Sequence, residues 1–423
     1  MMYLLKSHIF TASCLASLVI TGCESEPSAD SEPSAEMTLS DMSAPDLTLA
    51  TPDGALDASQ SLTPDMSFEP PALGAPSVDV DARRPAAELS SLSLVMWSRE
   101  AQRFVYGDQV IPYEISTPLF SDYTQKDRAV YVPPEGQVSV DPHGLLVLPH
   151  GSVTIKSFSY PSVDEAEGRR VIETRLMFRG QQGWSAWPYV WDTEREEANL
   201  SLSGAVLPQA DLPFLEDGEM FTYVVPQRNQ CIDCHEVKTA EGREITPIGI
   251  KLRNLSPASF EEGGLIRALI DRGQLDEREV EEALQRSRPQ VSWREVESRG
   301  VAQLAPDEVE VAARDYLDIN CAHCHNPRGA EGVSSQLFLN WDAEDPFHLG
   351  VCKKPGSAGK GTFGFTYDIV PGSPESSILW LRMDTVLIGS MMPDFGRSLR
   401  DQTGVELIYR WIAQLEGTCE ASE

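Results

Sequence analysis

The sequence predicts an α+β, multidomain protein in which an antiparallel β-rich domain, residues 93–225, precedes an all-α region. Between residues 93 and 225, short runs rich in valine, isoleucine and aromatic residues are separated by proline and glycine. From about residue 257 to residue 416, apolar side chains recur at the three- and four-residue spacing of amphipathic helices. A chain of 423 residues has room for two or three such domains.

The first residues of the chain predict export. Lys6 precedes the apolar run Ile9 to Ile20, which is too short to span a bilayer as a stable helix. This run leads into Leu18-Val19-Ile20-Thr21-Gly22-Cys23, which resembles the lipobox of bacterial lipoproteins, where the cysteine is acylated. We therefore expect residues 1–22 to be a signal peptide and Cys23 to carry a lipid, on the periplasmic side of the inner or outer membrane. Ordinary secretory cleavage, with Cys23 left free, is the alternative.

Residues 23–92 are predicted to form a disordered acidic tether. Between residues 24 and 92, fourteen acidic residues face only Arg83 and Arg84, and Phe68 is the sole aromatic residue. Such a segment cannot bury enough apolar surface to offset the entropy lost on ordering it.

Five strands are predicted in the β-rich domain, and one of them carries a row of aromatic residues. Trp187, Tyr189 and Trp191 alternate along their strand and so share one face, which favours sheet core over a platform for sugar stacking. The predicted strands are Ala129–Val132, Leu145–Leu148, Val153–Tyr160, Val171–Phe178 and Trp184–Trp191.

Helices are predicted in residues 226–300 and again in residues 301–423. One helix begins at Pro257 or Ser259 and ends at Gly273, with an apolar face of leucine and isoleucine. The others are a charged helix over Glu277–Gln285, a helix from Pro306 into Cys321, a helix over Ile378–Met383 capped by Ser373 and Pro374, and a last helix from Thr403 to Glu416 that stops at Gly417.

Two runs follow the pattern C-x-x-C-H, namely Cys231-Ile232-Asp233-Cys234-His235 and Cys321-Ala322-His323-Cys324-His325. Cysteines three apart share one turn of helix, so both thiols can reach the two vinyl groups on one edge of a porphyrin. The histidine that follows can then ligate the iron. With eight cysteines and seven histidines, one such run is expected by chance on the order of 0.003 times.

The two runs therefore predict two covalently bound haem c groups. Cys231 and Cys234 would hold the first haem and Cys321 and Cys324 the second, with His235 and His325 as axial ligands. Zinc binding or dithiol redox chemistry is the alternative, although the cysteine pairs of a zinc ribbon lie much closer together and need no following histidine.

Further runs between residues 110 and 416 recur in a known family. They are Pro112-Tyr113-Glu114, Pro118-Leu119-Phe120-Ser121-Asp122-Tyr123, Glu173-Thr174-Arg175-Leu176, Tyr189-Val190-Trp191, Asn229-Gln230-Cys231, Thr246-Pro247-Ile248-Gly249, Tyr316 through Pro327, Gly350-Val351-Cys352-Lys353 and Met391-Met392-Pro393. In these runs the chain resembles an uncharacterised family of exported dihaem c-type cytochromes. The resemblance implies haem electron transfer without naming a substrate, and it suggests a parallel β-helix protein as a candidate partner. Residues 301–423 also resemble class I cytochromes c, in which the first and last helices cross beside the haem.

The resemblance to class I cytochromes implies that Met392 is the sixth ligand of the second haem, with Met391 and Met383 as alternatives. For the first haem, His323 is a candidate because a histidine beside one motif ligates a neighbouring haem in some multihaem cytochromes. An open coordination site is the other serious possibility. Further candidates are Met177, Met220, His143, His150 and His348.

The remaining cysteines predict a disulfide bond. Cys14 leaves with the signal peptide, Cys23 takes lipid and four thiols take haem, which leaves Cys352 and Cys419. A pair of thiols in an oxidising compartment favours a bridge over two unrelated thiols.

The sequence thus predicts a membrane-anchored dihaem c-type cytochrome that transfers electrons to or from a redox partner protein in the bacterial cell envelope. A dihaem peroxidase or oxidase, with an open coordination site on the first haem, is the alternative. The formal net charge of −31 makes nucleic acid a poor partner. It favours a role in solubility alone, with steering of a basic redox partner as the alternative. A third interpretation, a carbohydrate-binding β domain, requires exposed side chains at Trp187 and Trp191.

Overall fold

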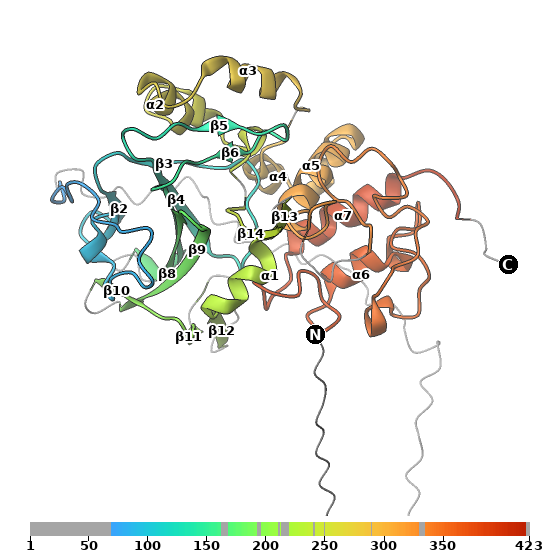
Figure 1. The fold of residues 1–423 in the computed structure, drawn as a ribbon. Helices are drawn as coiled ribbons and strands as arrows, with labels where there is room; N and C mark the ends of the chain where they lie inside the picture. The colour runs from blue at the N-terminus through green and yellow to red at the C-terminus, as the bar shows by residue number, and fades with distance from the viewer. Residues whose placement is uncertain are drawn as a thin grey trace, which may run out of the picture. The chain divides into compact units, whose positions relative to one another are not determined.

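The computed structural model describes residues 69–161, 168–192, 196–209, 212, 220–239, 242–248, 250–288, 290–329 and 335–419. The predicted signal peptide, Cys23 and the tether up to residue 68 lie outside these described residues. The fold is α+β, as predicted: an antiparallel β-sheet region over residues 95–245 is followed by a mostly helical C-terminal region (Figure 1).

A six-stranded sheet forms the centre of the β region. Its strand order is β10-β9-β8-β7-β4-β3, and every neighbouring pair is antiparallel. It contains four of the five predicted strands, whereas the fifth, Leu145–Leu148, lies in a separate two-stranded ribbon. The strands are β3 (Val110–Pro112), β4 (Gln125–Tyr131), β7 (Val153–Pro161), β8 (Arg169–Gly180), β9 (Gly183–Asp192) and β10 (Glu197–Leu200).

Two-stranded ribbons flank the central sheet. The sequence does not predict one of them, the hairpin of residues 236–245 that directly follows the first C-x-x-C-H run. The ribbons pair β1 (Val95–Ser98) with β2 (Arg103–Tyr106), β5 (Ser139–Val140) with β6 (Leu146–Val147), β11 (Ala205–Gln209) with β12 (Phe221–Val225), and β13 (Glu236–Thr239) with β14 (Gly242–Ile245).

The aromatic row of β9 is core, as the sequence favoured. Trp187, Tyr189 and Trp191 are buried in one cluster with β1, β2 and the inward residues of β7 and β8. Trp187 is 3% exposed and Trp191 is 8% exposed, so neither presents a face to a sugar ring. The structure therefore gives no support to a carbohydrate-binding platform on this strand.

The last part of the predicted tether belongs to the folded unit, so the predicted disorder is wrong there. Leu89 and Leu92 are buried in the same core cluster as the β9 aromatics, and Leu92 ends the short 3-10 helix η1 (Ser90–Leu92), which precedes β1. The Leu89 amide donates to the carbonyl of Ala198 over 2.9 Å, which ties this segment to β10. The prediction of disorder rested on the acidic composition of the whole segment, in which these few apolar residues carry little weight.

A second cluster covers part of the opposite sheet face. It joins β3, β4 and β6 to η3 (Leu252–Asn254), α2 (Leu265–Asp271) and α3 (Glu277–Gln285). The charged α3 has the bounds that the sequence predicted. The predicted helix after Pro257 is divided into a 3-10 turn, η4 (Pro257–Phe260), and α2, because Gly263 and Gly264 interrupt it and Gly263 has a φ of +82°.

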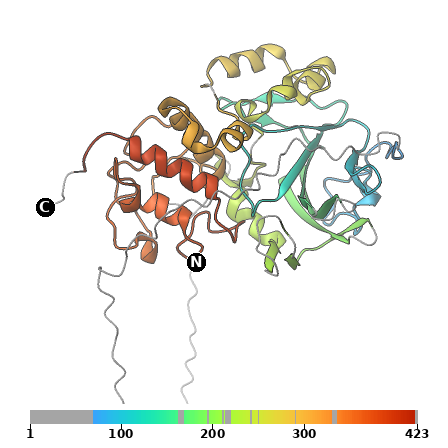
Figure 2. The same cartoon turned by 180° about the vertical axis from the view of Figure 1, so that it is seen from behind.

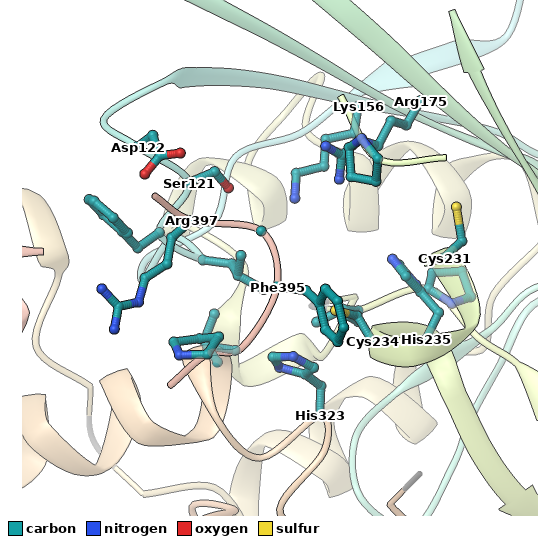
Figure 3. Close-up of a pocket in the computed structure, with 18 of the residues that line it drawn as sticks. Ser121, Asp122, Lys156, Arg175, Cys231, Cys234, His235, His323, Phe395 and Arg397 are labelled. Atoms are coloured by element: carbon teal, nitrogen blue, oxygen red, sulfur yellow. The ribbon is translucent and has the colours of Figure 1, made fainter. Parts of the chain in front are cut away.

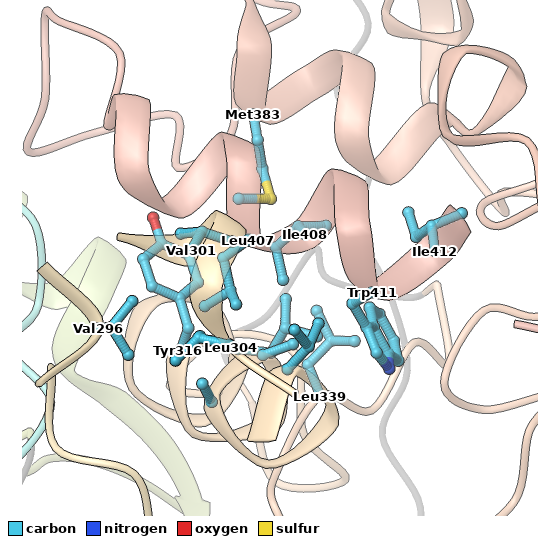
Figure 4. Packing of buried hydrophobic residues seen from close by; sticks show 14 of the residues in the cluster. Val296, Val301, Leu304, Tyr316, Leu339, Met383, Leu407, Ile408, Trp411 and Ile412 are labelled. Atoms are coloured by element: carbon cyan, nitrogen blue, oxygen red, sulfur yellow. The ribbon is translucent and has the colours of Figure 1, made fainter. Parts of the chain in front are cut away.

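The C-terminal region is built on the crossing of α5 (Pro306–Asn320) and α7 (Gln402–Gln414), with α6 (Ile378–Asp384) beside them. Figure 2 shows these helices from behind in orange and red, and Figure 4 shows Leu407, Ile408 and Trp411 packed on the α5 side. At the crossing, a Cβ on Gly404 would lie 2.5 Å from the Tyr316 ring, so only glycine allows this approach. The remaining helices are α1 (Cys231–His235), α4 (Trp293–Arg299), η2 (Arg228–Gln230), η5 (Val301–Gln303), η6 (Gly359–Thr362) and η7 (Pro374–Ser376).

Two predicted helix ends differ in the structure. Ser373 and Pro374 belong to the separate turn η7, and Ser377 is the residue that precedes α6. The last helix ends at Gln414 with Leu415 extended, before the predicted stop at Gly417. Local sequence did place both helices, but no side-chain cap marks the start of α6, and the chain becomes extended after Gln414 at the end of α7.

Candidate functional site

The first C-x-x-C-H run forms the single-turn helix α1, and the hairpin after it fixes the ring of His235. Pairing of Glu236 with Ile245 closes the β13–β14 hairpin, which brings Thr246 back beside His235. The Nδ1–H of His235 donates to the Thr246 carbonyl over 2.8 Å, and the Thr246 amide donates to the His235 carbonyl over 2.8 Å. Nε2 of His235 is thereby the nitrogen left to act as a ligand.

His235 lies on a cavity of about 330 Å³ that also carries Cys231, Cys234 and His323 (Figure 3). The wall of the cavity is partly apolar, with contributions from the sheet, the end of α5 and the loop after α6. Apolar residues of this wall include Met177, Trp187, Ile248, Ile250, Ile319 and Phe395. Two thiols, an oriented imidazole and an apolar wall on one cavity are the groups that a covalently attached haem requires, so these residues fit haem c.

The second run lies at the end of α5. Cys321 is the residue after the helix, its amide donates to the Leu317 carbonyl over 3.0 Å, and it packs against the core cluster of α5 and α7. The His325 amide donates to the Cys321 carbonyl over 2.9 Å, so the motif closes as a helical turn. No cysteine of either run is in a disulfide.

The structure brings the two runs into contact. The thiol of Cys324 lies 3.6 Å from the carbonyl of Asp233, inside the first run, and the Lys238 amide donates to the Arg328 carbonyl over 2.9 Å. His323 and His235 line the same cavity although they are 88 residues apart in the numbering. His323 therefore shares a cavity with the residues of the first run.

Burial keeps the three histidines of the runs in the neutral form. It lowers the pKa of His323 to about 4, and the neighbouring His235 lowers it further. Burial likewise lowers the pKa of His235 to about 4. Burial lowers the pKa of His325 to about 4, with smaller contributions from the neighbouring His323 and from the positive charges of Arg382 and Lys353. A neutral imidazole is the form that binds a metal.

Met392 lines the cavity of the first run, in the loop between α6 and α7. Its amide donates to the Arg382 carbonyl over 2.7 Å, which fastens the loop to α6. The charge of Arg382 also contributes to the lowered pKa of His325, in the second run. His325 itself is not among the described residues that line this cavity. The assignment of Met392 to the second haem therefore stays a prediction.

Two side chains that sequence reasoning missed hold the Met392 loop. The Nη2 of Arg397 donates to the carbonyls of Arg382, Met383, Thr385 and Met392, over 2.8 to 3.2 Å. Asp122, 3% exposed, accepts from the amide of Ser398 over 2.8 Å and from that of Leu399 over 2.8 Å. The loop is thus fixed from α6 and from the β region at once.

The segment that carries Asp122 also contacts the residue before the second run. The Phe120 amide donates to Asn320 Oδ1 over 2.7 Å, and Asn320 Nδ2 donates to the Pro118 carbonyl over 3.3 Å. Residues 118–123 therefore connect the end of α5, at Asn320, to the Met392 loop. The run stood out in the sequence only as part of the family resemblance, which gave no hint of this role.

Most alternative ligands lie elsewhere. His150 bonds Asp81 over 2.8 Å, His143 lies 3.5 Å from Asp342, and His348 stacks on Phe338 at 4.6 Å between ring centroids. Met220 is 63% exposed. Met177 and Met383 line the cavity, whereas Met391 is buried outside its described lining.

The structure confirms the Cys352–Cys419 disulfide, which joins residues 67 apart in the sequence. The bridge ties the end of the chain, past α7, to the segment that pairs with Ile369. It therefore closes a loop around α6 and α7.

Replacing Cys419 by serine is expected to lower the melting temperature of the oxidised protein. Chain-entropy models assign a closed loop of this length about 4 kcal/mol, since the bridge restricts the unfolded chain. Thermal unfolding by circular dichroism measures the effect, and full reduction of the wild-type protein should reproduce it. An unchanged melting temperature in both samples would show that the bridge does not stabilise the fold.

Comparison with protein-family models, with curated proteins and with solved structures finds no match to this chain. Within the described part of the chain, no helix is both long enough and apolar enough to cross a membrane. The same residues contain no group of three or more histidine, cysteine, aspartate or glutamate side chains arranged to hold a metal ion.

Proposed function

We propose that this protein is an exported, lipid-anchored c-type cytochrome that binds two haems covalently and transfers electrons in the bacterial cell envelope. Cys231 and Cys234 would hold the first haem, and Cys321 and Cys324 the second. His235 and His325 would be the proximal ligands.

The observation that carries the proposal is the environment of His235. Its Nδ1–H is committed to the Thr246 carbonyl over 2.8 Å, so the ring is held in one tautomer with Nε2 available. The cysteines of the same helical turn line the same cavity. A zinc ribbon or a redox dithiol needs neither the oriented histidine nor the partly apolar cavity.

When bound, haem iron supplies a one-electron couple, and the protein residues set its potential and access. His235 donates to a carbonyl, which raises the basicity of its ligating nitrogen. His323 lies on the same cavity and is the proposed sixth ligand of the first haem. Met392 is the proposed thioether ligand of the second haem, held by the bonds of Arg397 to its loop.

Carbon monoxide binding to the reduced protein separates the electron carrier from a peroxidase or oxidase. If His323 and Met392 complete the two coordination spheres, the wild-type protein should bind little carbon monoxide at either haem. His323→Ala should open the first site, so that about one haem in two binds the gas. Absorption difference spectra of the reduced protein, with and without carbon monoxide, measure the binding in the wild type and in the variant.

His348→Ala is the matched control, because His348 is half-buried against Phe338 and lies outside the described cavity lining. It should leave the spectra unchanged. Carbon monoxide binding at one haem of the wild-type protein would contradict the carrier assignment and favour the peroxidase or oxidase.

A further inference from the structure

Three cationic side chains form a row across the central sheet, at the cavity of the first C-x-x-C-H run. Arg128 on β4 pairs directly with Lys156 on β7, and Lys156 pairs directly with Arg175 on β8. All three line the cavity, and Figure 3 shows Lys156 and Arg175 on its wall. Like charges directly opposite one another destabilise a sheet, so this row has a cost that needs a compensating interaction.

Only Arg175 has a carboxylate partner. It donates from Nε and Nη2 to Glu173 over 2.8 and 2.6 Å, and Glu173 also accepts from the Tyr223 hydroxyl over 2.6 Å. Glu173 is fully buried. Its carboxylate is therefore occupied by Arg175 and Tyr223 and does not neutralise the rest of the row.

Lys156 and Arg128 have no ion pair in the described part of the chain. The Lys156 ammonium lies 5.0 Å from the centroid of the Phe158 ring, and Arg128 Nη1 donates to the Lys126 carbonyl over 3.1 Å. Burial and the positive charges of Arg128, Lys126 and Arg175 hold the pKa of Lys156 well below its usual range. Such an environment is unfavourable for a lysine until a negative charge enters it.

The carboxylates that line the cavity have other partners or face solvent. Asp122 accepts from the amides of Ser398 and Leu399. Asp401 caps α7, accepting from the Gly404 amide over 3.0 Å and from the Tyr316 hydroxyl over 3.0 Å. Asp394 is exposed. Around the row the positive charge is therefore in excess.

We propose that Arg128, Lys156 and Arg175 form a binding site for carboxylate groups inside this cavity. Guanidinium and ammonium groups are the usual partners of a buried carboxylate, and charge-assisted hydrogen bonds there are stronger than neutral ones. The carboxylates have two possible sources: the propionate groups of the first haem, or a free small dicarboxylate. Binding of haem propionates rests on the proposed function, whereas binding of a free dicarboxylate does not.

Lys156→Met tests the site, because it removes one charge with little change in length and leaves the Arg175–Glu173 pair intact. The probe for the first source is haem labelled with ¹³C at its propionate carboxyls. If propionates occupy the site, the labelled carboxylate bands shift in redox difference infrared spectra of the variant. Its first haem also has a lower midpoint potential, since a positive charge near the iron is lost.

The probe for the second source is succinate, titrated by calorimetry into the full chain. If a free dicarboxylate occupies the site, succinate binds the wild-type protein and binds Lys156→Met about tenfold or more weakly. Lys156→Arg keeps the charge and should therefore resemble the wild-type protein in its carboxylate bands and its succinate affinity. Lys360→Met, at an exposed lysine, should change neither property.

Unshifted carboxylate bands together with no succinate binding that depends on Lys156 would overturn the site. Haem content, measured separately by the pyridine haemochrome, tests the proposed function independently. A chain that retains no haem but binds succinate through Lys156 would refute the cytochrome and support the carboxylate site. A chain that retains two haems but shows neither shifted carboxylate bands nor Lys156-dependent succinate binding would support the cytochrome and refute the carboxylate site.

Discussion

Replacing Cys231 and Cys234 together by alanine is expected to reduce the covalently retained haem from two groups per chain to one. The two thiols are the proposed attachment points of the first haem, and Cys321 and Cys324 lie on a separate element at the end of α5. The pyridine haemochrome assay, normalised to protein, measures the loss. The remaining haem should keep the α-band position of a haem with two thioether bonds.

The matched variant replaces Cys321 and Cys324 and should also retain one haem. Because Cys324 contacts Asp233, each variant needs a circular dichroism spectrum to show that it is folded. Loss of both haems from a folded Cys231→Ala/Cys234→Ala protein would contradict two independently loaded sites.

Replacing Arg253 by methionine is expected to lower the free energy of unfolding by about 3–5 kcal/mol, the usual effect of removing one partner of a buried ion pair. Arg253 is 5% exposed and donates to Asp315, and it lies 3.5 Å from Asp318, so its loss would leave buried carboxylates short of a counter-charge. Burial already raises the pKa of Asp315, and the Arg253 charge opposes that rise. Denaturant unfolding with a fluorescence readout measures the change.

Arg267→Met is the control for this prediction, because Arg267 forms an exposed pair with Asp271 and should contribute little to stability. Adding Asp315→Asn to Arg253→Met should recover part of the loss, since the amide carries no charge. A single Arg253→Met variant as stable as the wild type would show that Lys251, 2.8 Å from Asp318, suffices to balance the site.

The sequence predicts the elements of this fold better than their arrangement. Runs of valine, isoleucine and aromatic residues between prolines and glycines located β7, β8 and β9, and the charged run Glu277–Gln285 gave the bounds of α3, because both signals are local. Residues 77–92 show where composition misleads. Leu89 is fully buried within a segment whose acidic composition predicts disorder, since a few apolar side chains suffice to anchor a chain to an existing core.

For the candidate site, too, the sequence predicts the residues better than their arrangement. The spacing within each C-x-x-C-H run identifies Cys231, Cys234 and His235 directly. The bond from His235 to Thr246 could not be predicted, because it depends on how a short hairpin closes; the alternation of Val237, Thr239 and Ile245 around Gly242 was the one signal for it.

The cationic row of Arg128, Lys156 and Arg175 could not be predicted from the sequence. It depends on the register between β4, β7 and β8, which brings residues 128, 156 and 175 into line. A shift of one residue in either pairing would have sent one of these side chains to the opposite face. Strand register over such separations is set by packing of the whole sheet, which no local pattern encodes.

The most direct test of the account is the intact mass of the denatured, full-length protein expressed in a host that attaches haem to C-x-x-C-H motifs. We expect a mass above that of the processed polypeptide by two haem groups, which stay attached under denaturing conditions because thioether bonds hold them. A mass equal to the polypeptide alone, from folded protein produced under the same conditions as a known c-type cytochrome, would contradict it.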